Sequence, residues 1–225
     1  MREIVLDTET TGLDPKAGDR IVEIGCVELI NHAPTENTFH CYINPERDMP
    51  KAAFAVHGLS ADFLSGQPVF AHFADDFLDF LKDAPLIIHN VPFDMGFINA
   101  ELKHLNRPPI PLDRAVDTLI MARRKFPGAQ ASLDALCRRF QIDNSNRELH
   151  GALKDSLLLA DVYLELIGGR QPGLGLSAEK AGADAPKTAP NKKRSPRPHA
   201  PSPDETRAHA AFLETITDPL WKTGA

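Results

Sequence analysis

The spacing of apolar residues predicts that the chain begins with strands. Residues 4–6 form a short apolar run, and longer runs rich in β-forming residues follow at 21–30 and 38–43. Polar turns separate these runs, so we expect the three strands to pair as an antiparallel meander. Two shorter runs, 86–88 and 115–116, predict brief buried strands later in the chain.

Helical spacing dominates the stretches between the later strands. The apolar side chains of residues 70–81 recur on one helical face, which indicates a helix packed against a core. We also expect helices at 97–105 and 157–166, and one that begins at Ser132, a residue type suited to a helix N-cap. Strands followed by alternating helix and strand indicate a mixed α/β sheet covered by helices.

Composition divides the chain into three segments. Residues 1–169 carry the dense apolar periodicity of a folded domain. Residues 170–203 are rich in Pro, Ala, Lys and Ser, a composition typical of a flexible linker. Residues 204–225 regain a helical pattern, with apolar residues at four-residue steps from Ala208.

The overall composition favours a soluble cytoplasmic protein. Hydrophobic residues make up 42% of the chain, an ordinary share for a soluble protein, and no apolar run is long enough to span a bilayer. The cysteines are scattered without metal-ligand spacing, as expected of buried thiols in a reducing compartment. The net charge of −6 argues against a module that reads DNA sequence, because such modules need many basic residues to neutralise phosphates.

Two acidic residues stand at the end of the first predicted strand. Asp7 and Glu9 are two positions apart, so their carboxylates lie on the same face of a strand. Like charges this close are unfavourable unless a cation lies between them, and hard divalent cations prefer carboxylate oxygens. Thr11 and Gly12 supply the turn that ends the strand. A lone pair of this kind is more often solvated, so other acids decide the interpretation.

Two later segments combine an acid with a nearby His. Asp94 follows His89, and Pro92 places this acid in the first turn of a helix, where the helix dipole favours a carboxylate. Asp155 follows His150 by five positions. Residues five apart on one helix point roughly 140° away from each other. We therefore place His150 in the segment before the helix and Asp155 within the helix.

These segments together supply four acids and one His: Asp7, Glu9, Asp94, His150 and Asp155. Their order and spacing resemble the DEDDh exonuclease superfamily. The segments 56–59, 132–137 and 143–145 also resemble the proofreading epsilon subunits of bacterial DNA polymerase III. The resemblance covers residues 3–169 and implies an RNase H-like α/β fold, in which helices flank a mixed five-stranded sheet and a flexible C-terminal tail follows.

The resemblance implies a 3′–5′ exodeoxyribonuclease that uses two divalent ions, Mg²⁺ or Mn²⁺. Asp7 would contact both ions, and Glu9 and Asp155 would contact one of them. Asp94 would hold the other ion, partly through water. His150 would act as general base and take a proton from the attacking water. The enzyme would release mispaired 3′-terminal nucleotides as 5′-monophosphates, the task of a proofreading subunit.

The resemblance also implies a pocket for the terminal nucleotides. Besides Asp7, Glu9 and Asp155, its lining would include Thr10, Leu13, His57, Asn90 and Phe93. Leu13 and Phe93 offer apolar faces against which a base can stack, although ordinary packing would account for such residues equally well. One position departs from the pattern. Ala52 stands where relatives often carry a substrate-contacting Glu, which puts one contact near the terminal sugar in doubt.

The tail contains two candidate partner-binding segments. Gln171, Leu174 and Leu176 match the short peptide with which replication proteins bind the sliding clamp, although a Pro/Gly-rich exit from the domain would have the same composition. The segment 204–225 cannot bury its apolar face alone, and in the family such a segment tethers the exonuclease to the polymerase subunit. Its candidate contact residues are Phe212, Ile216, Leu220 and Trp221.

Two other functions are compatible with these patterns. A stand-alone DEDDh exoribonuclease would use the same five residues but would need neither the linker nor the terminal segment. A non-catalytic scaffold that bridges clamp and polymerase would not need every catalytic position filled. Assays on DNA and RNA oligonucleotides distinguish the first alternative, and release of mononucleotides excludes the second.

Overall fold

The computed structural model describes residues 1–145, 149–169 and 200–217 of the chain. The chain divides into two compact units, Met1–Gly175 and Leu176–Ala225, which are described separately. Most of the predicted linker lies outside the described residues. None of the helices in the described ranges is long and apolar enough to cross a membrane.

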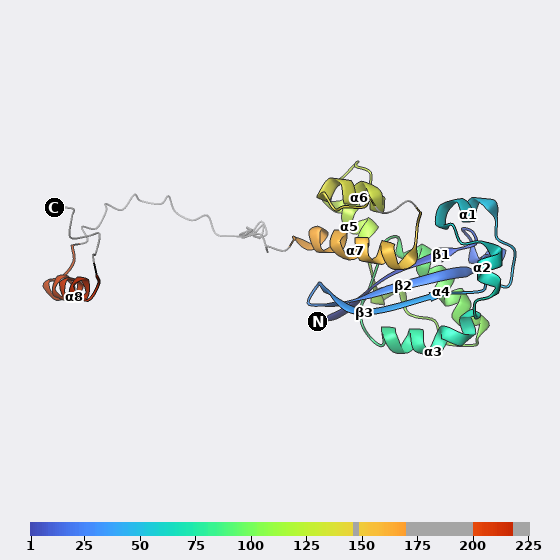
Figure 1. Ribbon diagram of the computed structural model, residues 1–225, viewed down its shortest axis with the longest axis horizontal. Coiled ribbons are helices and arrows are strands. Elements are labelled where there is room, and N and C mark those ends of the chain that lie inside the picture. Colours follow the sequence, from blue (N-terminus) through green and yellow to red (C-terminus); the bar gives the residue numbers. More distant parts are fainter. Residues whose placement is uncertain (146–148, 170–199, 218–225) are drawn as a thin grey trace, which may run out of the picture. The chain divides into compact units, whose positions relative to one another are not determined.

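A mixed five-stranded sheet forms the centre of the first unit (Figure 1). Its strands are β1 (Arg2–Thr10), β2 (Ile21–Ile30), β3 (Ala33–Tyr42), β4 (Leu86–Ile88) and β5 (Ala115–Asp117). The order across the sheet is β3-β2-β1-β4-β5. Strands β1, β2 and β3 pair antiparallel, whereas β4 pairs parallel with both β1 and β5. This arrangement confirms the predicted mixed sheet and its antiparallel meander.

The edge strand β3 begins earlier than predicted, at Ala33. Its first residues are mostly exposed and polar, because an edge strand has less contact with the core, so apolar alternation does not mark its start. The hairpin between β2 and β3 turns at Asn31 and His32, which both have positive φ angles. Asn and His are among the residue types that adopt this backbone conformation more readily than most.

Helices cover both faces of this sheet. They are α1 (Lys51–His57), α2 (Ala61–Ser65), α3 (Phe70–Leu81), α4 (Val91–His104), α5 (Thr118–Lys125), α6 (Leu133–Phe140) and α7 (Ala152–Ile167), with short 3₁₀ turns η1 (Pro15–Ala17) and η2 (Leu112–Arg114). Helix α3 has its predicted bounds, and Ser132 caps α6 as predicted, its Oγ accepting a hydrogen bond from the backbone N of Ala135 at 3.3 Å.

The remaining helices were predicted in part. Asp94 lies in the first turn of α4 and Asp155 in the first turn of α7, as predicted, although apolar spacing marks these helices only from residues 97 and 157, because their first turns carry buried polar residues. Helices α1, α2 and α5 were not predicted, since each is too short for a 3.6-residue periodicity to show.

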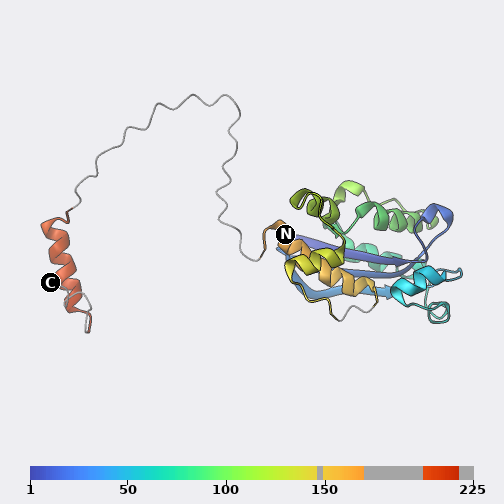
Figure 2. The same ribbon diagram turned by 90° about the horizontal axis from the view of Figure 1, so that it is seen from above.

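Two apolar cores lie on opposite faces of the sheet. Ile4 and Leu6 of β1 pack with residues of α3 and α4 on one face. Val5, which points the other way, packs with residues of α5, α6 and α7. In Figure 1 the first turn of α7 lies at the same end of the sheet as α1, and Figure 2 shows α1 and α2 at the end remote from the N-terminus. Strand β1 ends there, so its last residues lie where several elements meet.

Gly25 of β2 allows α7 to pack directly against the sheet. It is paired with Asp7 across the β1–β2 ladder. A Cβ atom at Gly25 would lie 2.2 Å from the backbone carbon of Ala152, closer than any real contact. The Oγ of Ser156 donates a hydrogen bond to the carbonyl of Gly25 at 2.9 Å. The first turn of α7 is therefore fixed beside the end of β1, together with Asp155.

The described part of the second unit contains one helix, α8 (Pro203–Glu214). A capping box begins it. The Ser202 hydroxyl accepts a hydrogen bond from the backbone N of Glu205, and the Glu205 carboxylate accepts one from the backbone N of Ser202. The helix ends earlier than the four-residue spacing suggested, since Thr215 is its C-cap and Ile216 lies beyond it. The Phe212 side chain is 60% exposed. Leu220 and Trp221 lie outside the described residues.

Candidate active site

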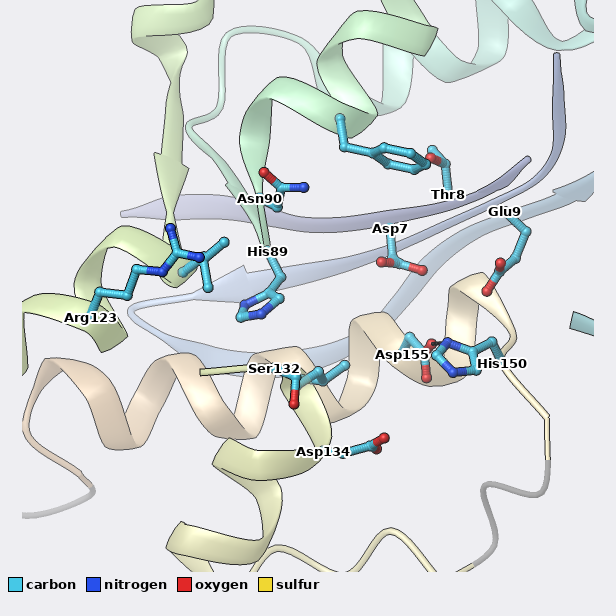
Figure 3. Close-up of a pocket in the computed structure, with 13 residues that line it drawn as sticks. Asp7, Thr8, Glu9, His89, Asn90, Arg123, Ser132, Asp134, His150 and Asp155 are labelled. Carbon is cyan, nitrogen blue, oxygen red and sulfur yellow. Dashed lines mark ion pairs between the residues drawn. The ribbon is translucent and has the colours of Figure 1, made fainter. Parts of the chain in front are cut away.

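Asp7 and Glu9 point into one cavity at the end of β1 (Figure 3). The cavity has a volume of about 490 Å³. Both carboxylates extend from the sheet face that α7 covers, as the two-residue spacing on a strand predicts. The strand ends at Thr10, where the predicted turn begins. The first acidic pair therefore lies at the place and on the face that the sequence indicates.

His150 and Asp155 reach the same cavity from the start of α7. His150 precedes the helix, and Asp155 lies in its first turn, as predicted. The His150 Nδ1 atom lies 3.4 Å from Asp155 Oδ2, and the side chain of His150 is 45% exposed whereas that of Asp155 is 3% exposed. One ligand atom each from Glu9, His150 and Asp155 lies within 4.8 Å of the others.

Helix α1 holds the backbone of the His150 segment. The backbone N of His150 donates a hydrogen bond to the carbonyl of Val56 at 3.1 Å. The preceding residue, Leu149, lies over Gly58, where an added Cβ would be 2.5 Å from Leu149 Cδ1. Gly58 also has a φ of 71°, a conformation that favours glycine. The C-terminal end of α1 therefore supports the backbone that carries the imidazole.

Asp94 lies on the opposite side of β1, in the first turn of α4. Its Oδ1 accepts hydrogen bonds from the backbone N of Thr8 at 3.0 Å and from the Thr8 hydroxyl at 2.7 Å. Burial raises the pKa of Asp94 to about 7, although the hydrogen bonds from Thr8 favour the ionised form. Asp94 is not among the residues that line the cavity. It joins the site through Thr8, the residue between Asp7 and Glu9.

The donor set fits a divalent cation. Asp7, Glu9 and Asp155 place carboxylates around one cavity, and His150 adds an imidazole nitrogen. Three carboxylates in so small a space repel one another unless positive charge lies between them. Carboxylate oxygens are also the ligands that Mg²⁺ and similar hard cations prefer. The raised pKa of buried Asp94 is the behaviour expected of a carboxylate that needs a cation beside it to remain ionised.

A second cavity of about 520 Å³ adjoins the first and shares Thr8, Glu9 and Phe93 with it. Four of the five residues expected to bind the terminal nucleotides line it, namely Thr10, Leu13, His57 and Phe93, and Ala52 lies in the same wall. Asn90 lines the first cavity instead. All five therefore border one connected region, and Leu13 offers it a side chain that is 85% exposed.

His57 has a defined protonation state in this second cavity. Its Nδ1 accepts a hydrogen bond from the backbone N of Leu59 at 3.0 Å, which assigns the proton of the neutral ring to Nε2. Burial lowers the pKa of His57, while the nearby charge of Glu23 opposes this change. A neutral His57 is therefore expected at physiological pH.

The first cavity also contains residues that sequence reasoning did not identify. They are Thr8, His89, Leu119, Arg123, Ser132, Leu133 and Asp134. Leu119 and Arg123 lie on the unpredicted helix α5, while Ser132 and Asp134 had been recognised as part of a helix start and of a segment that resembles the family, with no role in the site. His89 belongs to the segment already singled out, and its Nδ1 lies 2.9 Å from the Thr118 hydroxyl. The sequence gives no indication that a basic residue on so short a helix lies in this cavity.

Comparison of the sequence with known proteins gives a consistent result. The sequence profile described as Exonuclease matches residues 4–163. DNA polymerase III subunit epsilon of Rickettsia felis is 50% identical over 224 residues, which cover 96% of this chain and 97% of the relative. DNA polymerase III subunit epsilon of Escherichia coli K12 is 48% identical over 177 residues, or 75% of this chain and 72% of the relative.

Solved structures support the same fold at lower sequence identity. The nuclease domain of 3'hExo, a DEDDh family member bound to rAMP, superposes with a TM-score of 0.64 at 20% identity and covers 74% of this chain and 91% of that one. Exonuclease X in complex with 5′ overhanging duplex DNA gives a TM-score of 0.57 at 24% identity, with 73% and 90% covered. The mixed sheet with flanking helices is therefore an RNase H-like exonuclease fold.

Proposed function

Because this chain belongs to the exonuclease family and is a 3′–5′ exonuclease of the DNA polymerase III epsilon type, we propose that the cavity at the end of β1 is its active site. The observation that carries this proposal is the approach of Glu9, His150 and Asp155 to within 4.8 Å, beside Asp7. Its substrate is a 3′ end of DNA, frayed or single-stranded, and its product is a nucleoside 5′-monophosphate.

The acidic residues would hold two divalent ions, Mg²⁺ or Mn²⁺. Asp7 would serve both ions, Glu9 and Asp155 would hold one of them, and Asp94 would hold the other, partly through water. When bound, the ions lower the charge of the scissile phosphate and stabilise the attacking and leaving oxygens. The convergence of the carboxylates and the burial of Asp94 support this division. Thr8 positions Asp94 by its two hydrogen bonds.

His150 acts as the general base. Its exposed position at the cavity leaves the imidazole accessible to an attacking water, whose proton it accepts. The carboxylate of Asp155, 3.4 Å from Nδ1, can orient the imidazole ring. The bond between His150 N and the Val56 carbonyl keeps the residue at the mouth of the cavity.

The second cavity receives the terminal nucleotide. Leu13 and Phe93 supply apolar surfaces for the base. The Nε2 proton of neutral His57 offers a hydrogen-bond donor for the sugar and phosphate, and Asn90 offers another from the first cavity. The Thr10 hydroxyl, which donates to the carbonyl of Gly12 at 2.6 Å, offers an acceptor. Ala52 provides no polar group, so this enzyme contacts the terminal sugar without the carboxylate that relatives often have at that position.

The chain acts as the proofreading subunit of the replicative polymerase in the bacterial cytoplasm. Support comes from the Rickettsia relative, which carries the name of a polymerase III subunit and matches nearly the whole chain. Residues 204–225 bind the polymerase subunit through Phe212, Ile216, Leu220 and Trp221, and Gln171, Leu174 and Leu176 bind the sliding clamp. Phe212 on α8 is exposed as such an anchor requires.

The decisive experiment follows degradation of a 5′-labelled DNA oligonucleotide in Mn²⁺. The wild-type chain should shorten it stepwise from the 3′ end, and EDTA should stop the reaction. Asp7→Asn and His150→Ala should each lower kcat by at least about a hundredfold, as loss of a metal ligand or general base does. Asp79→Asn, an exposed change on α3, is the matched control.

The outcomes of this experiment separate the alternatives. Full turnover by the His150→Ala enzyme would remove the general-base role. Faster degradation of an RNA oligonucleotide than of DNA would favour a ribonuclease instead. Deletion of residues 204–225 should abolish co-purification with the polymerase subunit and spare activity on free oligonucleotides. If that deletion removed both properties, the nuclease and tethering roles would not reside in separate parts of the chain.

A further inference from the structure

Helices α5 and α6 carry a local excess of basic side chains. The stretch 118–140, which contains α5 and α6, has five basic residues, Arg123, Arg124, Lys125, Arg138 and Arg139, and a single acidic residue, Asp134. The chain as a whole carries a net charge of −6. All five basic side chains are exposed. Such a local reversal of charge marks a surface that attracts an anionic partner.

One of these residues belongs to the active-site cavity itself. Arg123 lines that cavity together with the acidic residues Asp7, Glu9 and Asp155. Figure 3 shows Arg123 on the side of the cavity opposite Glu9 and His150. Burial is the main cause of the lowered pKa of His89, and the positive charge of Arg123 acts in the same direction. The positive surface therefore begins inside the site where hydrolysis is proposed.

Helix α6 continues that surface away from the cavity. Its first turn lines the cavity with Leu133 and Asp134. Further along the helix, Arg138 and Arg139 line a separate hollow of about 520 Å³, together with Gln130 and Ala135. A strand that leaves the cavity beside α6 would reach this hollow next.

The individual side chains differ in how they are held. The guanidinium of Arg139 lies 4.5 Å from the centre of the Phe126 ring, which orients it on the surface. Lys125 instead donates hydrogen bonds to the carbonyls of Glu165 and Leu166 at the end of α7, so it has a structural role. We define the remaining four residues, Arg123, Arg124, Arg138 and Arg139, as the basic ridge.

We propose that the basic ridge binds the sugar–phosphate backbone of the substrate strand, at phosphates upstream of the terminal nucleotide. This inference rests on the proposed nuclease function. Arginine suits the task because its planar guanidinium forms paired hydrogen bonds with phosphate oxygens. A nucleic acid strand is favoured over an acidic protein because the ridge starts in the cavity that contains the catalytic carboxylates.

The test compares two substrates that differ only in whether they extend beyond the cavity. The p-nitrophenyl ester of thymidine 5′-monophosphate occupies the site of the terminal nucleotide alone, whereas a long single-stranded oligonucleotide would also cover the ridge. The variant carries Arg124→Gln and Arg138→Gln, which avoids the cavity residue Arg123 and the packed Arg139. The control is Arg107→Gln, a partly exposed arginine that pairs with Asp75 on the opposite layer at 2.6 Å.

The double variant should raise KM for the oligonucleotide roughly five- to tenfold relative to KM for the ester. The slope of log KM against log salt should become shallower by about 0.7 for each lost phosphate contact. Replacement of the same two residues by Lys should restore the slope, because Lys keeps the charge. Arg107→Gln should alter neither quantity. Thermal denaturation confirms that each variant is folded.

Results contrary to the ridge proposal can be told apart from results contrary to the proposed active site. An unchanged KM ratio and an unchanged salt slope in the double Gln variant would refute the ridge. Normal salt dependence combined with loss of polymerase binding would identify the ridge as a protein interface and also refute the proposal. Failure of the wild-type chain to hydrolyse even the ester would refute the proposed active site instead, so the two failures are distinguishable.

Discussion

At the scale of single residues, β1 serves two sides of the site by simple alternation. Asp7 and Glu9 point into the cavity on one face, while Thr8 between them binds Asp94 through its backbone N and its hydroxyl. Adjacent residues of a strand point to opposite faces, so three consecutive positions reach both α7 and α4. A small shift of β1 would therefore move Asp7 and Glu9 together and disturb the hydrogen bonds that position Asp94.

The buried Asp94 carboxyl should make stability depend on pH when divalent ions are removed. Its folded-state pKa of about 7 is above the ordinary value of 3.8. Between these values the unfolded chain releases the proton and the folded chain keeps it, so the contribution of Asp94 to stability falls as pH rises through this range. Asp94→Asn cannot ionise, and in EDTA at pH 8 it should raise Tm by several degrees.

Thermal denaturation in EDTA at pH 5 and pH 8 measures this effect. The gain from Asp94→Asn should be larger at pH 8, and addition of Mn²⁺ should stabilise the wild-type protein more than the variant. Asn keeps the oxygen that accepts the Thr8 hydrogen bonds, which makes the change nearly isosteric. A lower Tm for the variant at pH 8 in EDTA would show that burial does not dominate the energetics of Asp94.

Single residues could be predicted where their geometry is local. The spacing of Asp7 and Glu9 fixes a common face, and the five-residue separation of His150 and Asp155 places one outside the helix. The hydrogen bonds from Thr8 to Asp94 join residues 86 positions apart, and no pattern in either segment predicts them. Arg123 escaped prediction for the same reason, because its place in the cavity depends on how α5 packs.

At the scale of elements, the contact between α7 and β2 determines where Asp155 lies. Gly25→Ala would place a methyl group 2.2 Å from the Ala152 backbone, so the helix would have to move away from the sheet. We expect a loss of about 2 kcal/mol or more in the free energy of unfolding, a typical cost of overpacking. Activity should fall at least about tenfold, because displacement of reacting groups by even about 1 Å is costly.

Chemical denaturation and oligonucleotide hydrolysis measure these two effects for Gly25→Ala. Gly96→Ala on α4 is the matched control, since a Cβ there would lie 4.0 Å from Pro15 Cγ, an ordinary contact. It should be neutral or slightly stabilising, because Ala suits a helix interior better than Gly. If both substitutions had the same small effect, the close approach at Gly25 would not control the position of α7.

Elements could be predicted in proportion to the length of their apolar pattern. Helix α3 presents a full amphipathic face and was predicted with its observed bounds, whereas α1 and α5 are too short to show one. Strand β3 was shortened in the prediction because its exposed first half lacks alternation. The apolar spacing of α4 and α7 begins only after the buried acids Asp94 and Asp155, so the starts of these helices were predicted from Pro92 and from the separation of His150 and Asp155 instead.

At the scale of the whole molecule, the second unit contains a helix that buries nothing of its own. No residue of α8 is buried, and Phe212 is 60% exposed. A helix of 12 residues is marginal in water without tertiary contacts. The capping box at Ser202 and Glu205 favours its start but contributes only about 1 kcal/mol. The proposed tethering role would give its apolar side chains a surface to pack against.

A synthetic peptide of residues 200–225 should show little helicity by circular dichroism in water. Addition of the polymerase catalytic subunit should raise the helical signal, because binding would bury the apolar face. Phe212→Ala should weaken this binding by at least about tenfold, whereas Thr206→Ala on the same helix should have little effect. A fully helical free peptide, or equal binding by both variants, would contradict the tethering role of Phe212.

The predicted division of the chain into 1–169, 170–203 and 204–225 rests on composition and stays a prediction. Composition cannot place such a boundary to the residue, because loss of apolar periodicity is gradual. The candidate clamp peptide at Gln171, Leu174 and Leu176 lies outside the described residues and stays a prediction.

Helix α1 is shared by two tasks, with a consequence for how the enzyme discriminates. Val56 and His57 line the nucleotide cavity, while the Val56 carbonyl and Gly58 carry the segment of His150. A mispositioned nucleotide that displaces this short helix would also displace His150, the proposed general base. Loss of a correct fit and loss of activity would then occur together, and an inhibitor bound beneath α1 would inactivate the enzyme by displacing His150.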